Sequence, residues 1–132
     1  MMQGPNPDRE ELLKAKAQED AKALLQAYWQ FVKDNPQDFQ GWTYLLQHVE
    51  NIDFLDEIRT AYNAFLPLYP YCFAYWIRYS DLELKHENWQ RALAIMHRGL
   101  EAIPMSVDLW IAYLELYHKM YKKDPDFDGL FR

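Results

Sequence analysis

Few side chains in this sequence are spaced for catalysis or metal binding. Glu83 and His86 have the Glu-x-x-His spacing of helical di-iron sites, but such a site needs the motif twice and two further glutamates. Cys72 follows a proline where a helix is expected to begin, and a helix N-terminus can lower a thiol pKa. No histidine lies near it in sequence, so we expect a packed thiol. Ser80 and Ser106 lack the context of a nucleophile elbow. We therefore predict no catalytic residue, no cofactor and no metal.

The aromatic side chains are the other candidates for chemistry. Tryptophans and tyrosines can stack on single-stranded RNA, where each stacked base is worth about 1–3 kcal/mol. Such binding also needs a basic groove to follow the phosphates, whereas the chain has 14 Lys and Arg against 20 Asp and Glu and a net charge of -6. RNA binding therefore remains an alternative, and any RNA contact is expected to be indirect or weak.

Composition predicts that helices position these residues. A chain of 132 residues allows one domain of ordinary size. Leu and Ala total 29, while Val, Ile and Thr total 11, which favours helices over sheets. One cysteine excludes an internal disulfide. The polar residues 1–7 do not resemble a signal peptide, and no apolar run is long enough to cross a membrane, so we expect a cytosolic or nuclear protein without membrane contact.

One period runs through the sequence. Trp42, Trp76 and Trp110 are 34 residues apart. Prolines keep the same spacing, each six residues ahead of its tryptophan: Pro36, Pro70 and Pro104. A unit of this length is typical of a helix–turn–helix repeat, and the apolar spacing in each unit fits two amphipathic helices. The sequence therefore predicts an all-α fold, a right-handed solenoid of stacked helix pairs.

The same spacing gives the expected domains and helices. Residues 1–7 are expected to be a disordered tail and 8–132 a repeat domain, with an N-terminal helix at 8–34, repeats at 36–69 and 70–103, and an incomplete repeat at 104–132. Helices are expected at about 38–50, 55–66, 72–86, 88–102 and 106–122. Asn88 and Ser106 are the expected N-caps, and Pro67 should end its helix early. Residues 124–132 look like the start of another helix, so we expect a fragment of a longer array.

Details inside the repeat distinguish two families of this length. Tetratricopeptide repeats need small residues where their paired helices cross, and here only Ser80 with Ala92 forms a small pair. Instead, Leu or an aromatic residue follows each tryptophan by three positions, at Leu45, Tyr79 and Tyr113. In the second unit Glu83 follows the tryptophan by seven. This arrangement resembles the HAT (half-a-TPR) repeat of RNA-processing proteins.

Two longer segments sharpen the resemblance. Asp34-Asn35-Pro36-Gln37-Asp38-Phe39 and Arg98-Gly99-Leu100-Glu101-Ala102-Ile103-Pro104-Met105-Ser106-Val107-Asp108-Leu109-Trp110 look like the N-terminal HAT region of the pre-mRNA-processing factor 39 family. The resemblance covers roughly residues 25–117. Some positions depart from the repeat pattern: Leu45 replaces an aromatic residue, Glu50 falls one residue late, and Tyr117 stands where an acid is usual.

The resemblance implies a non-enzymatic nuclear scaffold in pre-mRNA splicing. Members of the family associate with the U1 small nuclear ribonucleoprotein, which recognises the 5′ splice site. They dimerise, with themselves or a paralogue, largely through a later HAT region that is absent here. The implied partners are therefore proteins of the U1 particle. A TPR-like peptide-binding adaptor, which would need a basic carboxylate clamp, remains an alternative beside the direct RNA-binding module.

The expected site residues have structural or contact roles. The repeat-signature residues, expected to pack, are Pro36, Trp42, Leu45, Glu50, Tyr62, Pro70, Trp76, Tyr79, Glu83, Pro104, Trp110 and Tyr113. Trp29 and Trp89 fall outside the tryptophan register, so they are candidates for partner contact. Arg91 and Arg98 join them as possible charged anchors.

Overall fold

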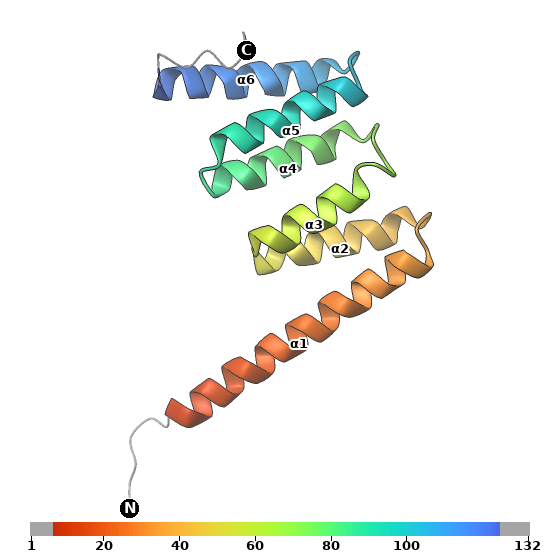
Figure 1. Cartoon of the computed structure of the whole chain (residues 1–132), viewed down its shortest axis with the longest axis vertical. Helices are drawn as coiled ribbons and strands as arrows, with labels where there is room; N and C mark the ends of the chain where they lie inside the picture. The colour runs from red at the N-terminus through yellow and green to blue at the C-terminus, as the bar shows by residue number, and fades with distance from the viewer. Residues whose placement is uncertain (1–6, 125–132) are drawn as a thin grey trace, which may run out of the picture. The chain divides into compact units, whose positions relative to one another are not determined.

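The computed structural model describes residues 7–124, and in that range the chain forms six α-helices (Figure 1). They are α1 (Pro7–Asp34), α2 (Phe39–Ile52), α3 (Leu55–Phe65), α4 (Phe73–Lys85), α5 (Trp89–Ala102) and α6 (Val107–Lys123). These bounds differ from the predicted ranges by at most two residues. The prediction of a further helix beginning near residue 124 lies outside the described residues.

The chain divides into two compact units, one holding α1 and α2 and the other α3 to α6. The division falls between Phe54 and Leu55, inside the first predicted repeat.

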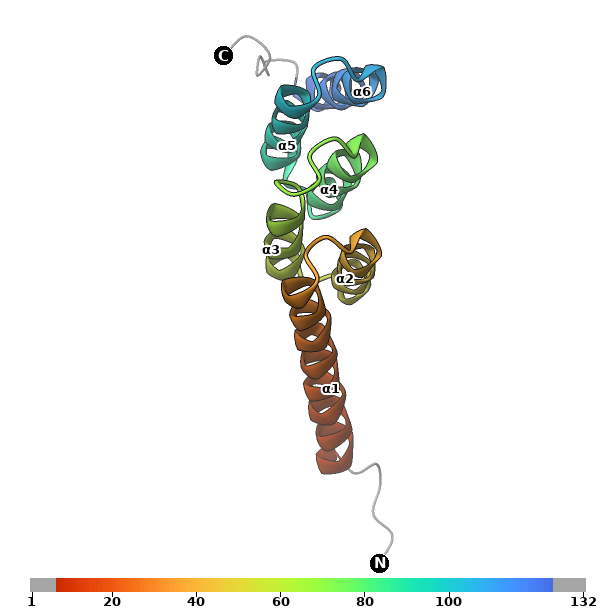
Figure 2. The same ribbon diagram turned by 90° about the vertical axis from the view of Figure 1, so that its right-hand side faces the viewer.

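In the first unit, the C-terminal part of α1 packs against α2, while its N-terminal part extends past α2 (Figure 2). Residues 8–20 of α1 are all exposed, including Leu12 and Leu13. The start of α2 is fixed by Asp38, whose carboxylate accepts a hydrogen bond from the Gly41 N–H at 3.1 Å. This bond satisfies one of the free N–H groups of the first turn.

In the second unit, α4 and α5 form the closest helix pair. The hydroxyl of Ser80 donates to the carbonyl oxygen of Ala92 at 3.0 Å, so the only small pair found in the sequence marks the place where these helices approach. Gly99 allows a second close approach, since a Cβ at this position would lie 2.9 Å from Cγ of Trp76. The last helix, α6, packs against α5 and also touches α4 (Figure 1).

The helix ends confirm two sequence predictions and correct one. Ser106 caps α6, because its hydroxyl oxygen accepts the Leu109 N–H at 3.2 Å. The helix before Pro67 ends early, at Phe65, as expected. Asn88 precedes α5 but makes no capping hydrogen bond with its side chain. Its amide N–H donates to Glu83 at 3.0 Å, and this charge-assisted contact holds the side chain in an orientation in which its oxygen does not cap α5.

Among the helices described between residues 7 and 124, none combines the length and apolar character that crossing a bilayer requires.

Candidate interaction site

The proline and tryptophan of each repeat are joined by one hydrogen bond. The indole N–H donates to the proline carbonyl oxygen six residues earlier, at 3.0 Å in Trp42–Pro36, 2.9 Å in Trp76–Pro70 and 2.8 Å in Trp110–Pro104. The bond ties the turn before each first helix to that helix and gives a buried ring a partner for its polar atom. The six-residue spacing seen in the sequence therefore has a geometric cause.

Trp110 departs from the expected core position. Trp42 and Trp76 are each 4% exposed, whereas Trp110 is 44% exposed. The ring of Trp76 is covered by Arg98 and Gly99 on α5. The ring of Trp110 keeps the hydrogen bond to Pro104, and by the 34-residue period the equivalent of Arg98 is Arg132, which lies outside the described residues.

Glu83 is the most buried carboxylate among residues 7–124, at 1% exposed. The guanidinium of Arg59 donates to both of its oxygens, Nε to Oε2 at 2.8 Å and a terminal nitrogen to Oε1 at 3.0 Å. Asn88 adds a third donor to Oε1. Burial alone would raise the pKa of Glu83, but the hydrogen bonds and charge of Arg59, with Asn88, outweigh it and lower that pKa. Glu83 thus links α3, α4 and the turn before α5.

Tyr79 extends this polar network to α5. Its ring stacks on Tyr62 at a centroid distance of 4.9 Å, and its hydroxyl lies 3.4 Å from the side-chain oxygen of Asn63. The same oxygen accepts a hydrogen bond from Arg98 at 3.2 Å, and the Arg98 guanidinium lies 5.4 Å from the ring centroid of Trp76. Burial raises the pKa of Tyr79, with the nearby charge of Glu83 acting in the same direction.

The remaining signature positions are occupied differently. Leu45 is fully buried, while Glu50, the displaced acid, is half-buried. Tyr113 is buried and its hydroxyl lies 3.0 Å from Nε2 of His97. Burial raises the pKa of Tyr113. The third repeat therefore keeps the tyrosine and changes its partner, since His97 stands where the second repeat has Asn63.

Of the four contact candidates, Trp29 lies on α1 in the first unit, whereas Trp89, Arg91 and Arg98 all lie on α5 in the second. Trp29 is half-buried and meets Trp42 edge to face at 6.2 Å, so it contributes to packing in the first unit. Trp89 is half-buried with the ammonium of Lys123 4.6 Å from its ring centroid. Arg91 and Arg98 are exposed on α5.

The residues considered for catalysis are held in structural contacts. Burial raises the pKa of the Cys72 thiol, which opposes thiolate formation. The Ser80 hydroxyl donates a hydrogen bond to the Ala92 carbonyl oxygen on α5. Sequence reasoning overlooked a second Glu-x-x-His segment, Glu115 to His118. In the part of the chain that the structure describes, no group of three or more His, Cys, Asp or Glu side chains is arranged to hold a metal ion.

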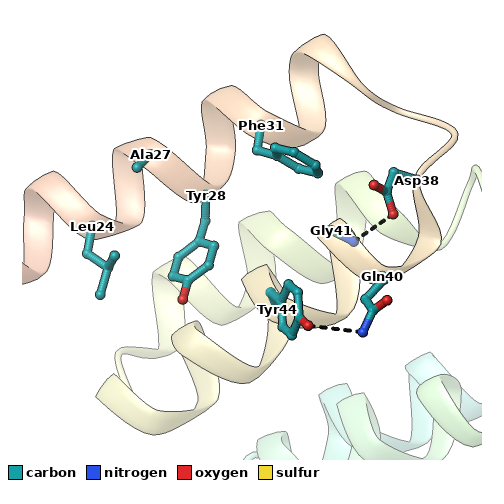
Figure 3. Close-up of a pocket in the computed structure, with 8 residues that line it drawn as sticks. All are labelled: Leu24, Ala27, Tyr28, Phe31, Asp38, Gln40, Gly41 and Tyr44. Atoms are coloured by element: carbon teal, nitrogen blue, oxygen red, sulfur yellow. Dashed lines mark hydrogen bonds between the residues drawn. The ribbon is translucent and has the colours of Figure 1, made fainter.

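An apolar groove lies between α1 and α2 (Figure 3). It has a volume of about 400 Å³ and is lined by Leu24, Ala27, Tyr28, Phe31, Asp38, Gln40, Gly41 and Tyr44. Leu24, Phe31 and Tyr44 are between 45% and 50% exposed, so large apolar surface faces solvent. The amide of Gln40 donates to the hydroxyl of Tyr44 and holds one wall.

Sequence reasoning missed this groove, although the repeat contains a signal for it. In the second repeat Phe65 packs edge to face on Tyr75, 5.0 Å between centroids. The residues 34 positions earlier are Phe31 and Gly41, so a glycine stands where the second repeat has a ring. Without that ring, Phe31 leans over Gly41, 2.6 Å from where a Cβ would be, and space remains beside it.

A smaller hollow of about 230 Å³ lies between α4 and α6. Its apolar lining includes Ile77 and Met96. Its charged lining consists of Asp81 and Glu115, which occupy the same position of successive repeats, and Lys119. Partial desolvation in the hollow raises the pKa of Asp81, which Lys119 opposes. Two acids and one base make this hollow a poor match for phosphate.

Comparison with known proteins places this architecture in a family. The family described as "PRP39 N-terminal HAT repeat" matches residues 26–131. Pre-mRNA-processing factor 39 of Homo sapiens is 45% identical over 106 residues, 80% of this chain and 16% of that protein. The Danio rerio protein of the same name is 53% identical over 83 residues, 63% of this chain and 11% of that protein.

The fold has a counterpart among solved structures. MamA MSR-1 C2 superposes with a TM-score of 0.50 at 14% identity, over 76% of this chain and 58% of that one. That likeness supports the all-α repeat fold alone. The match to the family extends over most of the sequence, although the chain spans less than a fifth of the length of the two relatives named above. The chain therefore belongs to the PRP39 family, in which it corresponds to the N-terminal HAT-repeat region, as the sequence motifs indicated.

Proposed function

We propose that this chain is a non-enzymatic protein-interaction module of pre-mRNA splicing, acting in the nucleus on proteins of the U1 small nuclear ribonucleoprotein at the 5′ splice site. Membership of the PRP39 family supports the splicing role. The observation that carries the interaction role is the exposed apolar groove between α1 and α2. Solvent-facing apolar side chains gathered in one concave place are typical of protein-binding surfaces.

The groove suits an apolar anchor from a partner. Its walls come from two packed helices, so the site exists before binding and little ordering is needed. Tyr28 and Tyr44 offer aromatic surface with polar tips, the side-chain type that dominates protein interfaces. Asp38 at the edge favours a partner with a basic residue beside its apolar anchor.

The exposed arginines are the proposed charged contacts. Arg91 and Arg98 are exposed on α5, a position suited to the rim of an interface, where a charge mainly affects association rate. Arg98 would act there while it keeps its contacts with Asn63 and Trp76. Trp29 in the first unit and Trp89 in the second are half-buried, and each remains a proposed contact within its own unit. Dimerisation through later repeats, or with a paralogue, is proposed for the longer protein only.

An affinity capture from nuclear extract tests the groove. The tagged chain is compared with Leu24→Glu, which places a charge in the groove, and with Leu12→Glu, the same change at a 70% exposed leucine of α1 outside it. We expect U1 proteins to be enriched by the wild type and by Leu12→Glu, and to fall at least fivefold for Leu24→Glu. Circular dichroism checks that both variants stay helical.

Nuclease treatment separates the alternatives. Enrichment that survives it is expected for protein contacts, whereas loss of all captured proteins would indicate RNA binding and contradict the proposal. Equal capture of U1 proteins by Leu24→Glu and the wild type would show that the groove does not bind them. Capture of chaperones through their C-terminal carboxylates would favour the peptide-binding adaptor.

A further inference from the structure

The groove between α1 and α2 corresponds to a closed part of the second unit. Four residues of α1 form one wall of the groove: Leu24, Ala27, Tyr28 and Phe31. The residues 34 positions later, on α3, are all 0% exposed: Ile58, Ala61, Tyr62 and Phe65. In α1, by contrast, Leu24 is 47% exposed and Phe31 45%. Nearly the same side chains are therefore core on α3 and surface on α1.

Two aromatic rings pack on Phe65 in the second unit. Tyr69 stacks on it with 5.2 Å between ring centroids, and Tyr75 meets it edge to face at 5.0 Å. In the first unit, Asn35 stands at the position of Tyr69 and Gly41 at the position of Tyr75. The phenylalanine of α1 therefore lacks both rings that cover its counterpart on α3.

The groove keeps aromatic walls for a ring that is supplied from outside. Phe31 lines it from α1 and Tyr44 lines it from α2 (Figure 3). Tyr44 stands at the position of Arg78, whose guanidinium lies 5.5 Å from the centroid of the Tyr75 ring. A guest ring in the groove would therefore contact Phe31 and Tyr44, as the Tyr75 ring contacts its two neighbours.

The size and polarity of the groove suit one aromatic side chain. A cavity of about 150 Å³ holds benzene, so a groove of about 400 Å³ can hold a phenol or an indole. Packing against another ring adds about two- to tenfold in affinity beyond the effect of the buried area, and an aliphatic side chain lacks this gain. Asp38 adds a carboxylate to the lining, which can accept a hydrogen bond from a phenol hydroxyl or an indole N–H.

We infer that the groove is the receptor for one aromatic side chain, a tyrosine or tryptophan, of a partner protein. The guest ring packs between Phe31 and Tyr44 and takes the place that the Tyr75 ring has in the second unit. The inference rests on the proposed function in one respect, that the groove binds a partner. It adds the chemical class of the residue that the partner inserts.

NMR titration of the purified 132-residue chain tests the preference for a ring. The probes are p-cresol, which is the side chain of tyrosine, and 4-methylcyclohexanol, its saturated counterpart. The reporter is the backbone amide signal of Gln40, a residue of the groove lining. We expect this signal to shift saturably with p-cresol, with an affinity at least about threefold above that for the saturated probe.

Three variants locate the binding. Gly41→Tyr copies the second repeat and should weaken p-cresol binding at least tenfold, because its ring fills the groove from within. Tyr44→Leu removes one aromatic wall and should weaken the binding about two- to fivefold. Tyr121→Leu, on α6, is the matched control because Tyr121 is 49% exposed and Tyr44 50%; it should bind p-cresol like the wild type. Circular dichroism checks each fold, and Tyr44→Leu decides the test if Gly41→Tyr does not fold.

Several results would overturn the inference. They are equal affinities for the two probes, a Gln40 signal that p-cresol does not move, and undiminished p-cresol binding by Tyr44→Leu. A Gln40 signal that moves with protein concentration in the absence of probe would assign the groove to a second copy of this chain and would also overturn it. The capture of U1 proteins is independent: if the chain prefers p-cresol but Leu24→Glu captures U1 proteins like the wild type, the proposed function fails and this inference stands.

Discussion

Removing Arg59 should cost more stability than removing its partner Glu83, and it should reverse the pH dependence of the protein. The two side chains share a bidentate ion pair, but they differ in access to water: Glu83 is 1% exposed and the Arg59 side chain 22%. In Arg59→Ala the carboxylate stays buried without its main donor. In Glu83→Ala the guanidinium can turn toward solvent.

The magnitudes follow from that difference. Leaving one charge of a buried pair without its partner costs about 3–5 kcal/mol, which is the expectation for Arg59→Ala at pH 7. Glu83→Ala should cost about 2–3 kcal/mol, because a partly exposed guanidinium regains hydration. The double variant Arg59→Ala/Glu83→Ala should lose less stability than the two single variants added together, by at least about 1 kcal/mol, because both substitutions remove the same interaction.

The pH dependence has a definite sign. In the wild type the pKa of Glu83 is lowered relative to the unfolded chain, where a glutamate has a pKa of about 4.3. Its contribution to stability is therefore present above that pH and lost as pH falls through the lowered folded value. In Arg59→Ala, burial becomes the dominant influence and raises the pKa of Glu83 in the folded state. The variant should then become more stable as pH falls from 7 to 5.

Urea unfolding followed by circular dichroism at 222 nm, at pH 7 and pH 5, measures both effects. Asp56→Ala is the control, because Asp56 is 79% exposed and lies 3.9 Å from the same guanidinium. It should change stability by less than about 0.5 kcal/mol. Additive single variants, or an Arg59→Ala protein that loses stability on acidification, would refute this account of Glu83.

Three further predictions concern the tryptophans, a glycine and the cysteine. Trp76→Phe should lower the free energy of unfolding by about 1–2 kcal/mol, because it removes a buried hydrogen bond. Trp110→Phe should lower it by less than half as much, because water reaches the ring of Trp110. Urea unfolding compares the two variants, and equal losses would contradict the difference in burial. Gly99→Ala should destabilise the protein by about 1–2 kcal/mol, because the new Cβ would lie 2.9 Å from Cγ of Trp76. This loss should exceed the gain from the better helix propensity of Ala. A variant that is more stable to urea than the wild type would contradict the prediction. Cys72 should react with a disulfide reagent at pH 7 more slowly than a free cysteine, because burial raises its pKa; a faster reaction would show an activated thiol.

The helices were predictable because one period recurs three times. A 34-residue repeat with proline and tryptophan in fixed register specifies helix number, order and approximate ends, and the bounds found agree within two residues. The all-α HAT-type fold and the family were confirmed. The burial of individual repeat positions was less predictable, since it depends on the side chains that meet there in the folded chain. Trp110 occupies the same repeat position as Trp76, yet it is 44% exposed, against 4% for Trp76.

The details that sequence missed arise from side chains meeting across helices. Asn88 has the side chain of an N-cap, but its amide N–H donates to the buried carboxylate of Glu83 and its oxygen accepts no capping hydrogen bond. The groove between α1 and α2 depends on Gly41 replacing a ring that is present one repeat later. That difference becomes visible only when the repeats are aligned position by position and Phe31 is known to face Gly41.

Direct binding of purified U1 small nuclear ribonucleoprotein to the immobilised chain tests the central claim. Biolayer interferometry at physiological salt would follow the titration, with the Leu24→Glu and Leu12→Glu chains on parallel sensors. The account predicts saturable binding by the wild type and by Leu12→Glu, weakened at least fivefold by Leu24→Glu. A folded wild-type chain that binds no U1 particle at micromolar concentration would contradict it.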